Sequence, residues 1–455
     1  MPKIFLKTMG CKVNAWDTAA LITEFKNLGY QIVDTPDQAD VSLLNSCTVT
    51  SRADQEGRAL LRRFKRSNPG TKVVATGCYA QTDSARLMAM DEVDYVVPNS
   101  GKKDLAGWIH AQLTARPDGT PRTDLTPPGM GEKPREHFKT ALHMTAANTD
   151  QTRAYLKVQD GCNGFCSYCI IPWARGASRS VESGQVLAEV RRLTAAGYRE
   201  IILTGIHLGD YGADHDDPGG LHGLLKAMLE LPGSFRIRLS SLEPGEVDEP
   251  TLALLATAGE RFCHHFHLPL QSGHDRILKQ MRRTYDTSTY GKKVKLIRSY
   301  FPQALIAADV IPGFPGETAG EHQATMDFIN DTRIDDLHVF PYSRRPGTMA
   351  DRLPGHLHPR EIRERAGELR RLGAGRQTAW RQSFAGAELT VLWEKRQDKA
   401  GRIIGRTGHY LEVVSCPDLA VPGEFSRVRL RPGRDGVMEG IPTPDGVQQT
   451  SSSSE

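Results

Sequence analysis

The sequence predicts an α/β protein in three parts: an N-terminal open parallel α/β domain, a central partial (β/α)6 barrel, and a small C-terminal antiparallel β-barrel. Three observations predict this fold. Residues 1–115 alternate short apolar strands with helical stretches, and residues 151–376 do so again. Such alternation is typical of parallel sheets. Residues 384–443 instead carry short β-like runs separated by Gly and Pro, as small barrels do.

In the first part, the apolar runs 3–7, 40–45, 72–76 and 94–97 are short enough to be buried strands. Helical stretches lie between them, among them 51–66 and 80–90. We therefore expect βαβ units and one parallel sheet over residues 1–115. Residues 116–150 are rich in Pro, Gly, Thr and charged residues, which predicts a linker.

The second part, residues 151–376, repeats the alternation over a longer stretch. Its expected strands are 154–158, 200–204, 235–240, 264–269, 304–311 and 336–340. Its expected helices are 184–196, 220–230, 250–258, 274–282 and 317–330. A complete parallel barrel has eight units, so six units predict a partial barrel. The chemistry should lie in the loops that follow the strands, because ligands bind there in such folds.

The third part is expected to span residues 377–443. A basic helical stretch at 359–383 leads into it, with a net charge of about +4. The runs 388–396, 401–415 and 425–432 then read as strands of a small barrel. Residues 444–455 end in SSSSE and are expected to be a flexible tail.

Composition excludes several classes of protein. Of 455 residues, 39% are hydrophobic and 25% charged, which is ordinary for a globular chain and excludes a disordered or fibrous one. No apolar run approaches the ~18 residues of a membrane-spanning helix. The N-terminus enters a strand pattern and lacks the apolar core of a signal peptide, so we expect a cytoplasmic protein with no membrane partner. A net charge of +4 is too small to establish nucleic-acid binding by itself.

The strongest motif is a cysteine triplet at Cys162, Cys166 and Cys169, with the spacing Cys-x3-Cys-x2-Cys. Thiolates are the natural ligands of iron–sulfur clusters. Three of them hold three irons of a four-iron cluster and leave the fourth open for a small molecule. The alternative is a structural zinc knuckle, which needs four closed ligands. No nearby Cys or His completes such a set.

Three further cysteines, Cys11, Cys47 and Cys78, each follow a predicted strand within a few residues. Because the carboxyl ends of parallel strands meet at one edge of a sheet, we expect these three to lie together. Small and polar neighbours suit exposed turns that hold a second open cluster. The alternative for any one of them is a small buried hydrophobe. We assign that structural role to Cys263 and Cys416, which have no cysteine neighbours.

The triplet resembles that of the radical S-adenosylmethionine enzymes, whose fold is also a partial barrel. The resemblance implies that the open iron binds S-adenosylmethionine and that reduction releases a 5′-deoxyadenosyl radical. Tyr168 matches the aromatic residue near the adenine, and polar or Gly segments follow the later strands in the family's order. Taken alone, any one of these segments is as consistent with a simple turn as with a cofactor-binding loop. The cofactor contacts that the resemblance implies are Tyr168, Thr204, Gly205, Ser241, Glu243, Gln271, Asp309 and Gly313.

Both cysteine sets together resemble the methylthiotransferase subgroup of this family, over nearly the whole chain. The resemblance implies an enzyme with two [4Fe-4S] clusters, one on Cys11, Cys47 and Cys78 and one, with S-adenosylmethionine bound, on the triplet. All six cysteines are then catalytic. One S-adenosylmethionine supplies the radical, another the methyl group, and the first cluster carries the sulfur. The C-terminal barrel corresponds to an RNA-binding module of the TRAM type.

Within the subgroup, KTMGCKVNAWDT (7–18) and LHVFPYSRRPGTMA (337–350) resemble the branch that modifies C2 of N6-threonylcarbamoyladenosine next to the tRNA anticodon. The isopentenyladenosine branch tends to read Gly-Cys-Gln-Met-Asn where this chain has Gly-Cys-Lys-Val-Asn (10–14), and the branch acting on a ribosomal aspartate reads Gly-Cys-Pro-Lys-Asn. Those two substrates remain alternatives. An alternative of another class is a noncatalytic iron–sulfur protein that binds RNA and senses redox state.

We expect the anticodon arm of tRNA, an external electron donor and a sulfur source as partners of a monomer. RNA would meet the basic helix, Trp393, Tyr410 and the barrel arginines, although solvated strand faces explain the same residues. Either Arg344 or Arg345 would meet a phosphate or the threonyl carboxylate, unless the segment is only a turn. His207 and His338 lack metal-ligand spacing and read as polar lining or core. The barrel arginines are Arg402, Arg406, Arg427, Arg429, Arg431 and Arg434.

Overall fold

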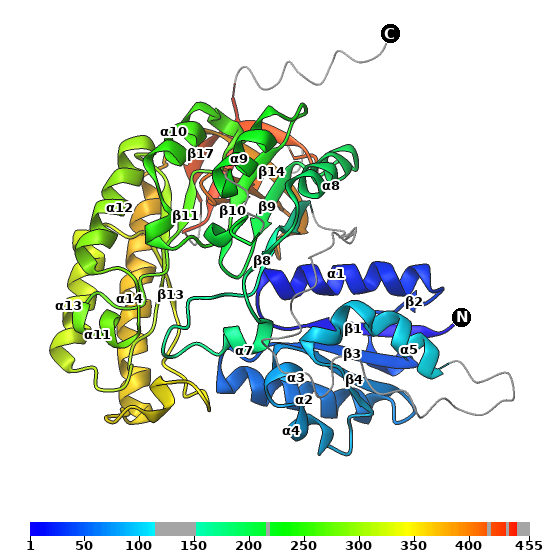
Figure 1. Ribbon diagram of the computed structural model, residues 1–455. Helices are drawn as coiled ribbons and strands as arrows, with labels where there is room; N and C mark the ends of the chain where they lie inside the picture. The colour runs from blue at the N-terminus through cyan, green and yellow to red at the C-terminus, as the bar shows by residue number, and fades with distance from the viewer. Residues whose placement is uncertain (114–151, 215–218, 416–419, 434–435, 444–455) are drawn as a thin grey trace, which may run out of the picture.

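The computed structural model describes residues 1–113, 152–214, 219–415, 420–433 and 436–443 (Figure 1). All three predicted parts are present: a parallel α/β sheet, a central parallel α/β region and a five-stranded barrel. The predicted linker 116–150 and tail 444–455 lie outside the described residues, as do Cys416 and Arg434. No helix in the described ranges is long and apolar enough to cross a membrane.

The N-terminal part is a five-stranded sheet in the order β2-β1-β3-β4-β5, and all of its pairs are parallel. Helices cover it on both sides, so the central strand β3 is buried along its whole length. The expected helix at 80–90 is two short helices that meet at Asp83. The elements are β1 Lys3–Thr8, α1 Lys12–Asn27, β2 Gln31–Ile32, β3 Val41–Ser46, α2 Ser51–Ser67, β4 Lys72–Gly77, α3 Cys78–Thr82, α4 Ser84–Met88, β5 Tyr95–Val96 and α5 Leu105–Leu113.

The central part contains six parallel strands in two sheets, β10-β9-β6 and β11-β12-β13. Parallel bridges from Ile237 to Phe262 and from Ser241 to His267 join the two sheets, so the strands follow one another in sequence order as an open arc. Its strands are β6 Arg153–Lys157, β9 Glu200–Thr204, β10 Arg236–Leu239, β11 His265–His267, β12 Leu305–Val310 and β13 Asp336–Val339. Its helices are α8 Ser183–Ala195, α9 Gly220–Glu230, α10 Glu249–Thr257, α11 Asp275–Gln280, α12 Thr287–Tyr300 and α13 Ala319–Asp331.

Both edges of the open arc are covered. Trp16 of α1 packs with Tyr155 of β6, so the N-terminal part adjoins one edge. On the other edge, α14 (Pro359–Gln382) lies against β13, where a side-chain carbon on Gly373 would come within 3.0 Å of Leu337. Gly373 therefore permits this close approach. α14 runs through residue 376, where the sequence predicts the end of the second part, and the barrel strands begin at Glu388.

The C-terminal part is a closed barrel in the order β14-β15-β16-β18-β17. The sequence predicts an antiparallel barrel, and this is wrong for one pair, because β16 and β18 run parallel. A closed ring with an odd number of strands cannot alternate direction at every pair. Trp393 is fully buried at its centre. The strands are β14 Glu388–Gln397, β15 Ile403–Thr407, β16 Glu412–Ser415, β17 Phe425–Pro432 and β18 Met438–Pro442.

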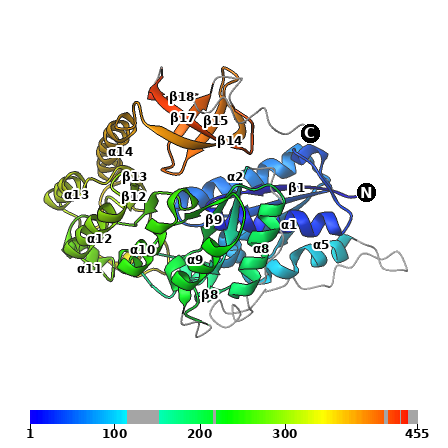
Figure 2. The same cartoon turned by 90° about the horizontal axis from the view of Figure 1, so that it is seen from above.

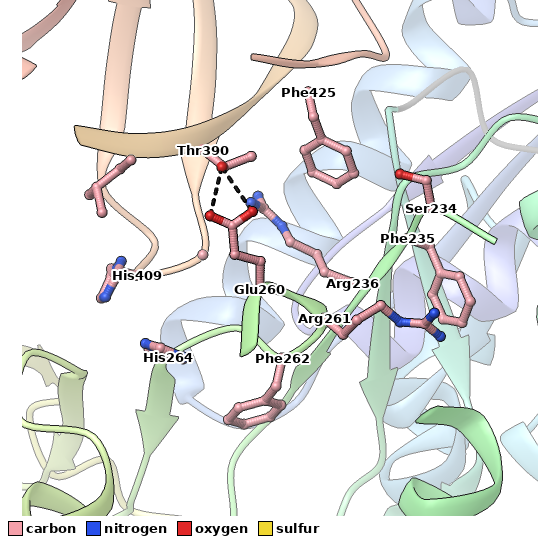
Figure 3. Close-up of a pocket in the computed structure, with 12 residues that line it drawn as sticks. Ser234, Phe235, Arg236, Glu260, Arg261, Phe262, His264, Thr390, His409 and Phe425 are labelled. Carbon is pink, nitrogen blue, oxygen red and sulfur yellow. Dashed lines mark hydrogen bonds between the residues drawn. The ribbon is translucent and has the colours of Figure 1, made fainter. Parts of the chain in front are cut away.

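The barrel contacts the central part at the amino ends of β10 and β11. Figure 2 shows the barrel at the top of the view, beyond α14. A cavity of about 280 Å³ remains between the barrel and the central part (Figure 3). Glu260 crosses it and accepts hydrogen bonds of 2.9 and 3.0 Å from the Thr390 hydroxyl. This cavity is at the opposite end of the strands from the predicted cysteine sites, so it anchors the barrel and does not belong to the candidate site.

Candidate functional site

The cysteine triplet occupies the loop between β7 (Gln159–Asp160) and α7 (Ile171–Arg175). Gly161 opens the loop with φ +77°, and a Cβ there would lie 1.9 Å from the Ala177 carbonyl oxygen, so only glycine fits. The backbone N–H of Ser167 donates to the Met281 carbonyl over 3.0 Å, and its carbonyl accepts from Ala350 over 2.8 Å. The loop is thus held from two distant segments, and its three cysteines are partly exposed.

Hydrogen-bond donors surround the triplet sulfurs. The N–H of Gly164 lies 3.3 Å from Cys162 Sγ, and Arg283 Nη1 lies 3.1 Å from Cys166 Sγ. Burial raises the pKa of the Cys169 thiol to about 12, and the N–H of Ile171 opposes that rise. These donors offset part of the cost of burying a thiolate, the form that binds metal. The residues present therefore fit the iron–sulfur cluster that the resemblance implies.

Arg283 is a site residue that sequence reasoning missed. Its side chain is 5% exposed, and it forms an ion pair with Glu243, a predicted cofactor contact. It also lies 3.4 Å from the hydroxyl of Tyr168, another predicted contact. Arg283 thereby links the triplet to both. No strand-end pattern marks this residue, which follows the short helix α11, and only its position in three dimensions identifies it.

One cavity of about 190 Å³ collects Tyr168, Gln271 and Asp309 beside Cys169. Gln271 has φ +66°, and its buried Oε1 has no hydrogen-bond partner among the described residues. An unsatisfied buried acceptor is costly, so it fits a ligand that donates to it. Val49 and Thr50, which follow Cys47, form the opposite wall together with residues 340–343. The cavity therefore lies between the central and N-terminal parts.

The other predicted contacts lie outside the lining of this cavity. Thr204 is buried at the end of β9, and a Cβ on Gly205 would lie 2.7 Å from Gln159 Oε1. The backbone of Ser241 forms an isolated parallel β-bridge with that of His267. Gly313 packs against Ile362 of α14, and its N–H donates to Glu317 over 2.8 Å. These residues shape the strand ends, and their contact with the cofactor stays a prediction.

The dispersed cysteines meet at one sheet edge. Cys11 precedes α1, Cys47 follows β3 and Cys78 begins α3, and β1, β3 and β4 are neighbours in the sheet. Gly10 has φ +91°, and a Cβ there would lie 2.8 Å from Cys47 Sγ, so glycine keeps the space beside that sulfur open. Burial raises the pKa of Cys47 to about 11, and the nearby thiols of Cys78 and Cys11 act in the same direction. Three neighbouring thiols, with open space beside Cys47 Sγ, fit a second iron–sulfur cluster.

Two histidine clusters lie close to these sites. His267 Nε2 and His338 Nδ1 lie 2.7 and 3.1 Å from Asp309 Oδ1. Burial alone would raise the pKa of Asp309, but the hydrogen bonds from both rings hold it below its usual range. His207 lies 3.7 Å from Cys162 Sγ and 3.0 Å from Asp210. Neither His207 nor His338 is buried in the core. Each lies in a group of side chains of metal-ligand type, His207 with Asp210 and Glu246 and His338 with His267 and Asp309, which their spacing in the sequence does not indicate.

Several residues assigned to RNA or substrate have other partners. Arg345 is buried and donates to Asp54 and to the Thr48 hydroxyl, both over 2.7 Å, so it joins the central and N-terminal parts and is not free for an anion. Arg344 is exposed beside Asp351. Trp393 lies in the barrel core, and Tyr410 stacks on His265 of β11, 4.9 Å between ring centres. The prediction that Trp393 meets RNA is therefore wrong, because its ring is fully buried. Tyr410 is half-buried, and its contact with RNA stays a prediction.

Four of the six predicted barrel arginines divide into two groups; Arg402 is paired with Asp398 and Glu439, and Arg434 lies outside the described residues. Arg406 is only 15% exposed and is paired with Glu394 and Glu412. Arg427, Arg429 and Arg431 alternate along β17 and are 62%, 51% and 61% exposed. With a period of two they share one face of the strand, beside Glu388 and Glu439. Only this second group forms an exposed row.

Comparison with known families covers both cysteine sites. Residues 3–98 match the family described as "Uncharacterized protein family UPF0004", and residues 156–329 match the radical SAM superfamily. The first range contains Cys11, Cys47 and Cys78, and the second contains the triplet.

Curated relatives match along almost the whole chain. The threonylcarbamoyladenosine tRNA methylthiotransferase MtaB of Bacillus subtilis is 36% identical over 94% of both chains. The protein of the same name from Aquifex aeolicus is 37% identical over 86% of this chain and 92% of that one. The tRNA-2-methylthio-N(6)-dimethylallyladenosine synthase of Trichlorobacter lovleyi is 31% identical over 95% and 97%. Among solved structures, the radical S-adenosylmethionine methyltransferase TsrM of Kitasatospora setae shares the fold, with a TM-score of 0.54, 17% identity and 77% coverage of each chain.

Proposed function

The chain belongs to the radical S-adenosylmethionine methylthiotransferase family, and from this premise we propose that it methylthiolates C2 of N6-threonylcarbamoyladenosine beside the tRNA anticodon. The relatives named for that tRNA substrate support the proposal. So does the approach of both cysteine sites to one cavity, which Cys169 of the triplet lines together with Val49 and Thr50, the residues two and three positions after Cys47. That convergence is the observation that carries the proposal, because sulfur insertion needs a radical source and a sulfur source near the same substrate atom.

In this proposal Cys162, Cys166 and Cys169 hold the cluster that binds S-adenosylmethionine. When loaded, such a cluster supplies the carbon radical that removes hydrogen from an unactivated C–H bond. Gln271 Oε1 and the Tyr168 ring then position the cofactor in the cavity. Arg283, held by Glu243, keeps a cation beside Cys166. The cavity walls from both parts exclude water from the reacting atoms, which protects a radical from side reactions.

Cys11, Cys47 and Cys78 hold the second cluster, which carries the sulfur to be transferred. The open space that Gly10 leaves beside Cys47 Sγ suits this role. Val49 and Thr50 continue from Cys47 into the wall of the cavity, so the sulfur site and the cofactor site share a border. A substrate base bound in the cavity would then lie next to both the sulfur site and the cofactor site.

Lys12 supports the choice of substrate. It follows Cys11 directly, is half-buried, and makes no hydrogen bond or ion pair within the described ranges. Burial lowers its pKa, and the charges of Tyr410 and Glu200 oppose this fall. Glu200 itself forms ion pairs with Arg236 and Arg238, so Lys12 has no carboxylate of its own. A half-buried cation without a carboxylate partner attracts an anion. The threonylcarbamoyl group carries a carboxylate, whereas the isopentenyl group is apolar.

Replacing Lys12 with Gln is therefore expected to lower kcat/KM for tRNA carrying N6-threonylcarbamoyladenosine about 10- to 100-fold, the loss of one charge-assisted hydrogen bond. Methylthiolated nucleosides formed by the reconstituted enzyme are measured by mass spectrometry. Lys7→Gln, a change at an exposed position of β1, is the matched control and should leave the rate unchanged. Equal rates for wild type and Lys12→Gln would exclude Lys12 from recognition. A wild-type preference for isopentenyladenosine would overturn the proposed substrate itself.

The exposed arginine row of β17 supports tRNA as the macromolecular partner. Arg427, Arg429 and Arg431 present three guanidinium groups on one strand face. Such groups neutralise phosphates and make binding salt-dependent. Glu388 and Glu439 offset part of this charge, so the row gives general attraction to the backbone and leaves recognition of the base to the cavity.

A further inference from the structure

A buried network of charges joins the two cysteine sites. Asp17 of α1 accepts hydrogen bonds from Lys157 Nζ over 2.5 Å and from Lys102 Nζ over 3.0 Å. Lys157 also reaches Asp160, 3.3 Å away, just before the triplet. Burial alone would raise the pKa of Asp17, but the surrounding cations hold it well below its usual range. Charges this deeply buried are retained only when they are paired.

Arg175 is the centre of this network. It ends α7, follows Cys169 closely in the chain and is 1% exposed. Its Nη1 donates to both carboxylate oxygens of Asp160, over 2.8 and 3.0 Å. Its Nη2 donates to Asn14 Oδ1 over 2.5 Å and to Asp17 over 3.2 Å. One rigid guanidinium thus binds the triplet loop to the helix that begins after Cys11.

The third nitrogen of the guanidinium, Nε, has no acceptor among the described residues. Arg175 Nε is also buried. Asn99 Nδ2 donates to the carbonyl of Ala174, the residue before Arg175, over 3.1 Å and lies 3.8 Å from Cys78 Sγ, so Arg175 adjoins the N-terminal cysteine site. A buried N–H without a partner is costly, which indicates an acceptor that binds here.

We propose that Arg175 is a positioning residue whose Nε–H donates to a sulfur of the cluster on Cys11, Cys47 and Cys78, while its other two nitrogens hold that cluster in register with the triplet. The inference rests on the proposed second cluster. Thiolates and sulfides are the acceptors that the buried Nε–H lacks. A cation and a hydrogen bond stabilise the more negative, reduced cluster, so Arg175 raises its reduction potential.

The test uses full-length protein in which Cys162, Cys166 and Cys169 are alanine, so that only the N-terminal cluster contributes to the spectra. Arg175→Lys keeps the charge but removes the Nε–H in its fixed plane. We expect bound iron to be retained, the midpoint potential to become more negative, and the electron paramagnetic resonance signal of the reduced cluster to change. Arg236→Lys, at a buried arginine paired with Glu200, is the matched control and should change neither.

An unchanged potential and spectrum in Arg175→Lys would overturn the inference. If that variant does not fold, the protein with Arg175 intact and 15N-labelled arginine answers the same question. A 15N hyperfine coupling to the reduced cluster supports the hydrogen bond, and its absence overturns it. Absence of any iron in the protein without the triplet would overturn the second cluster of the proposed function, and this inference with it.

Discussion

Replacing Cys162, Cys166 and Cys169 together with alanine is expected to abolish both cleavage of S-adenosylmethionine and methylthiolation, to below about one thousandth of the wild-type rates. The physical reason is that these three thiolates would hold the cluster that passes an electron to S-adenosylmethionine, and without that electron no carbon radical forms to remove hydrogen from an unactivated C–H bond. Bound iron should fall by about half, because one of two four-iron clusters is lost. The measurements are 5′-deoxyadenosine and methylthiolated nucleoside by mass spectrometry, with iron per chain.

Cys263→Ala is the matched control for the triplet variant. Cys263 is fully buried just before β11, its N–H donates to the Ile237 carbonyl of β10, and its thiol lies 3.9 Å from Glu200 Oε2. It has no cysteine neighbour in the sequence. This variant should keep its iron and its activity, with at most a modest loss of stability. Methylthiolation that survives in the triplet variant would contradict the radical mechanism.

The second prediction with a large expected effect distinguishes the roles of the two cysteine sites. Replacing Cys11, Cys47 and Cys78 with alanine should leave cleavage of S-adenosylmethionine within about threefold of wild type while methylthiolated product falls below about one thousandth. The triplet loop is held by Met281 and Ala350, neither of which belongs to the N-terminal sheet, so radical formation should persist. The ratio of methylthiolated nucleoside to 5′-deoxyadenosine measures this uncoupling.

Equal loss of both products in the N-terminal variant would show that the two sites are not separable, and would contradict a role confined to sulfur supply. Product formed at the normal rate would contradict that role altogether. Gly10→Ala offers a milder form of the same test, because its Cβ would press against Cys47 Sγ without removing a ligand.

The fold was largely predictable because its signals are local. Apolar runs mark the buried strands, and the parallel topology then brings Cys11, Cys47 and Cys78 to one edge although they are far apart in the chain. The triplet needs no fold at all to be recognised, since its ligands are neighbours in sequence. One detail of the barrel was missed, the parallel pair β16–β18, because strand count and closure are properties of the whole sheet.

Residues that act across the boundary between parts were not predictable in the same way. Arg345 has the appearance of an anion-binding arginine, yet Asp54 from another part of the chain neutralises it. Tyr410 has the appearance of an exposed RNA contact, yet it packs on the central strands. Arg175 and Arg283 show no pattern of their own. In each case the partner is more than a hundred residues away in the sequence. Only the packing of the three parts of the chain against one another determines what such a residue does.

The most direct test of the central claim is nucleoside mass spectrometry of bulk tRNA from a strain that lacks this gene, with and without the gene restored. The account predicts that 2-methylthio-N6-threonylcarbamoyladenosine disappears, that N6-threonylcarbamoyladenosine accumulates, and that restoring the gene reverses both changes. An unchanged level of 2-methylthio-N6-threonylcarbamoyladenosine, with loss of the isopentenyl analogue or of a ribosomal aspartate modification instead, would contradict it.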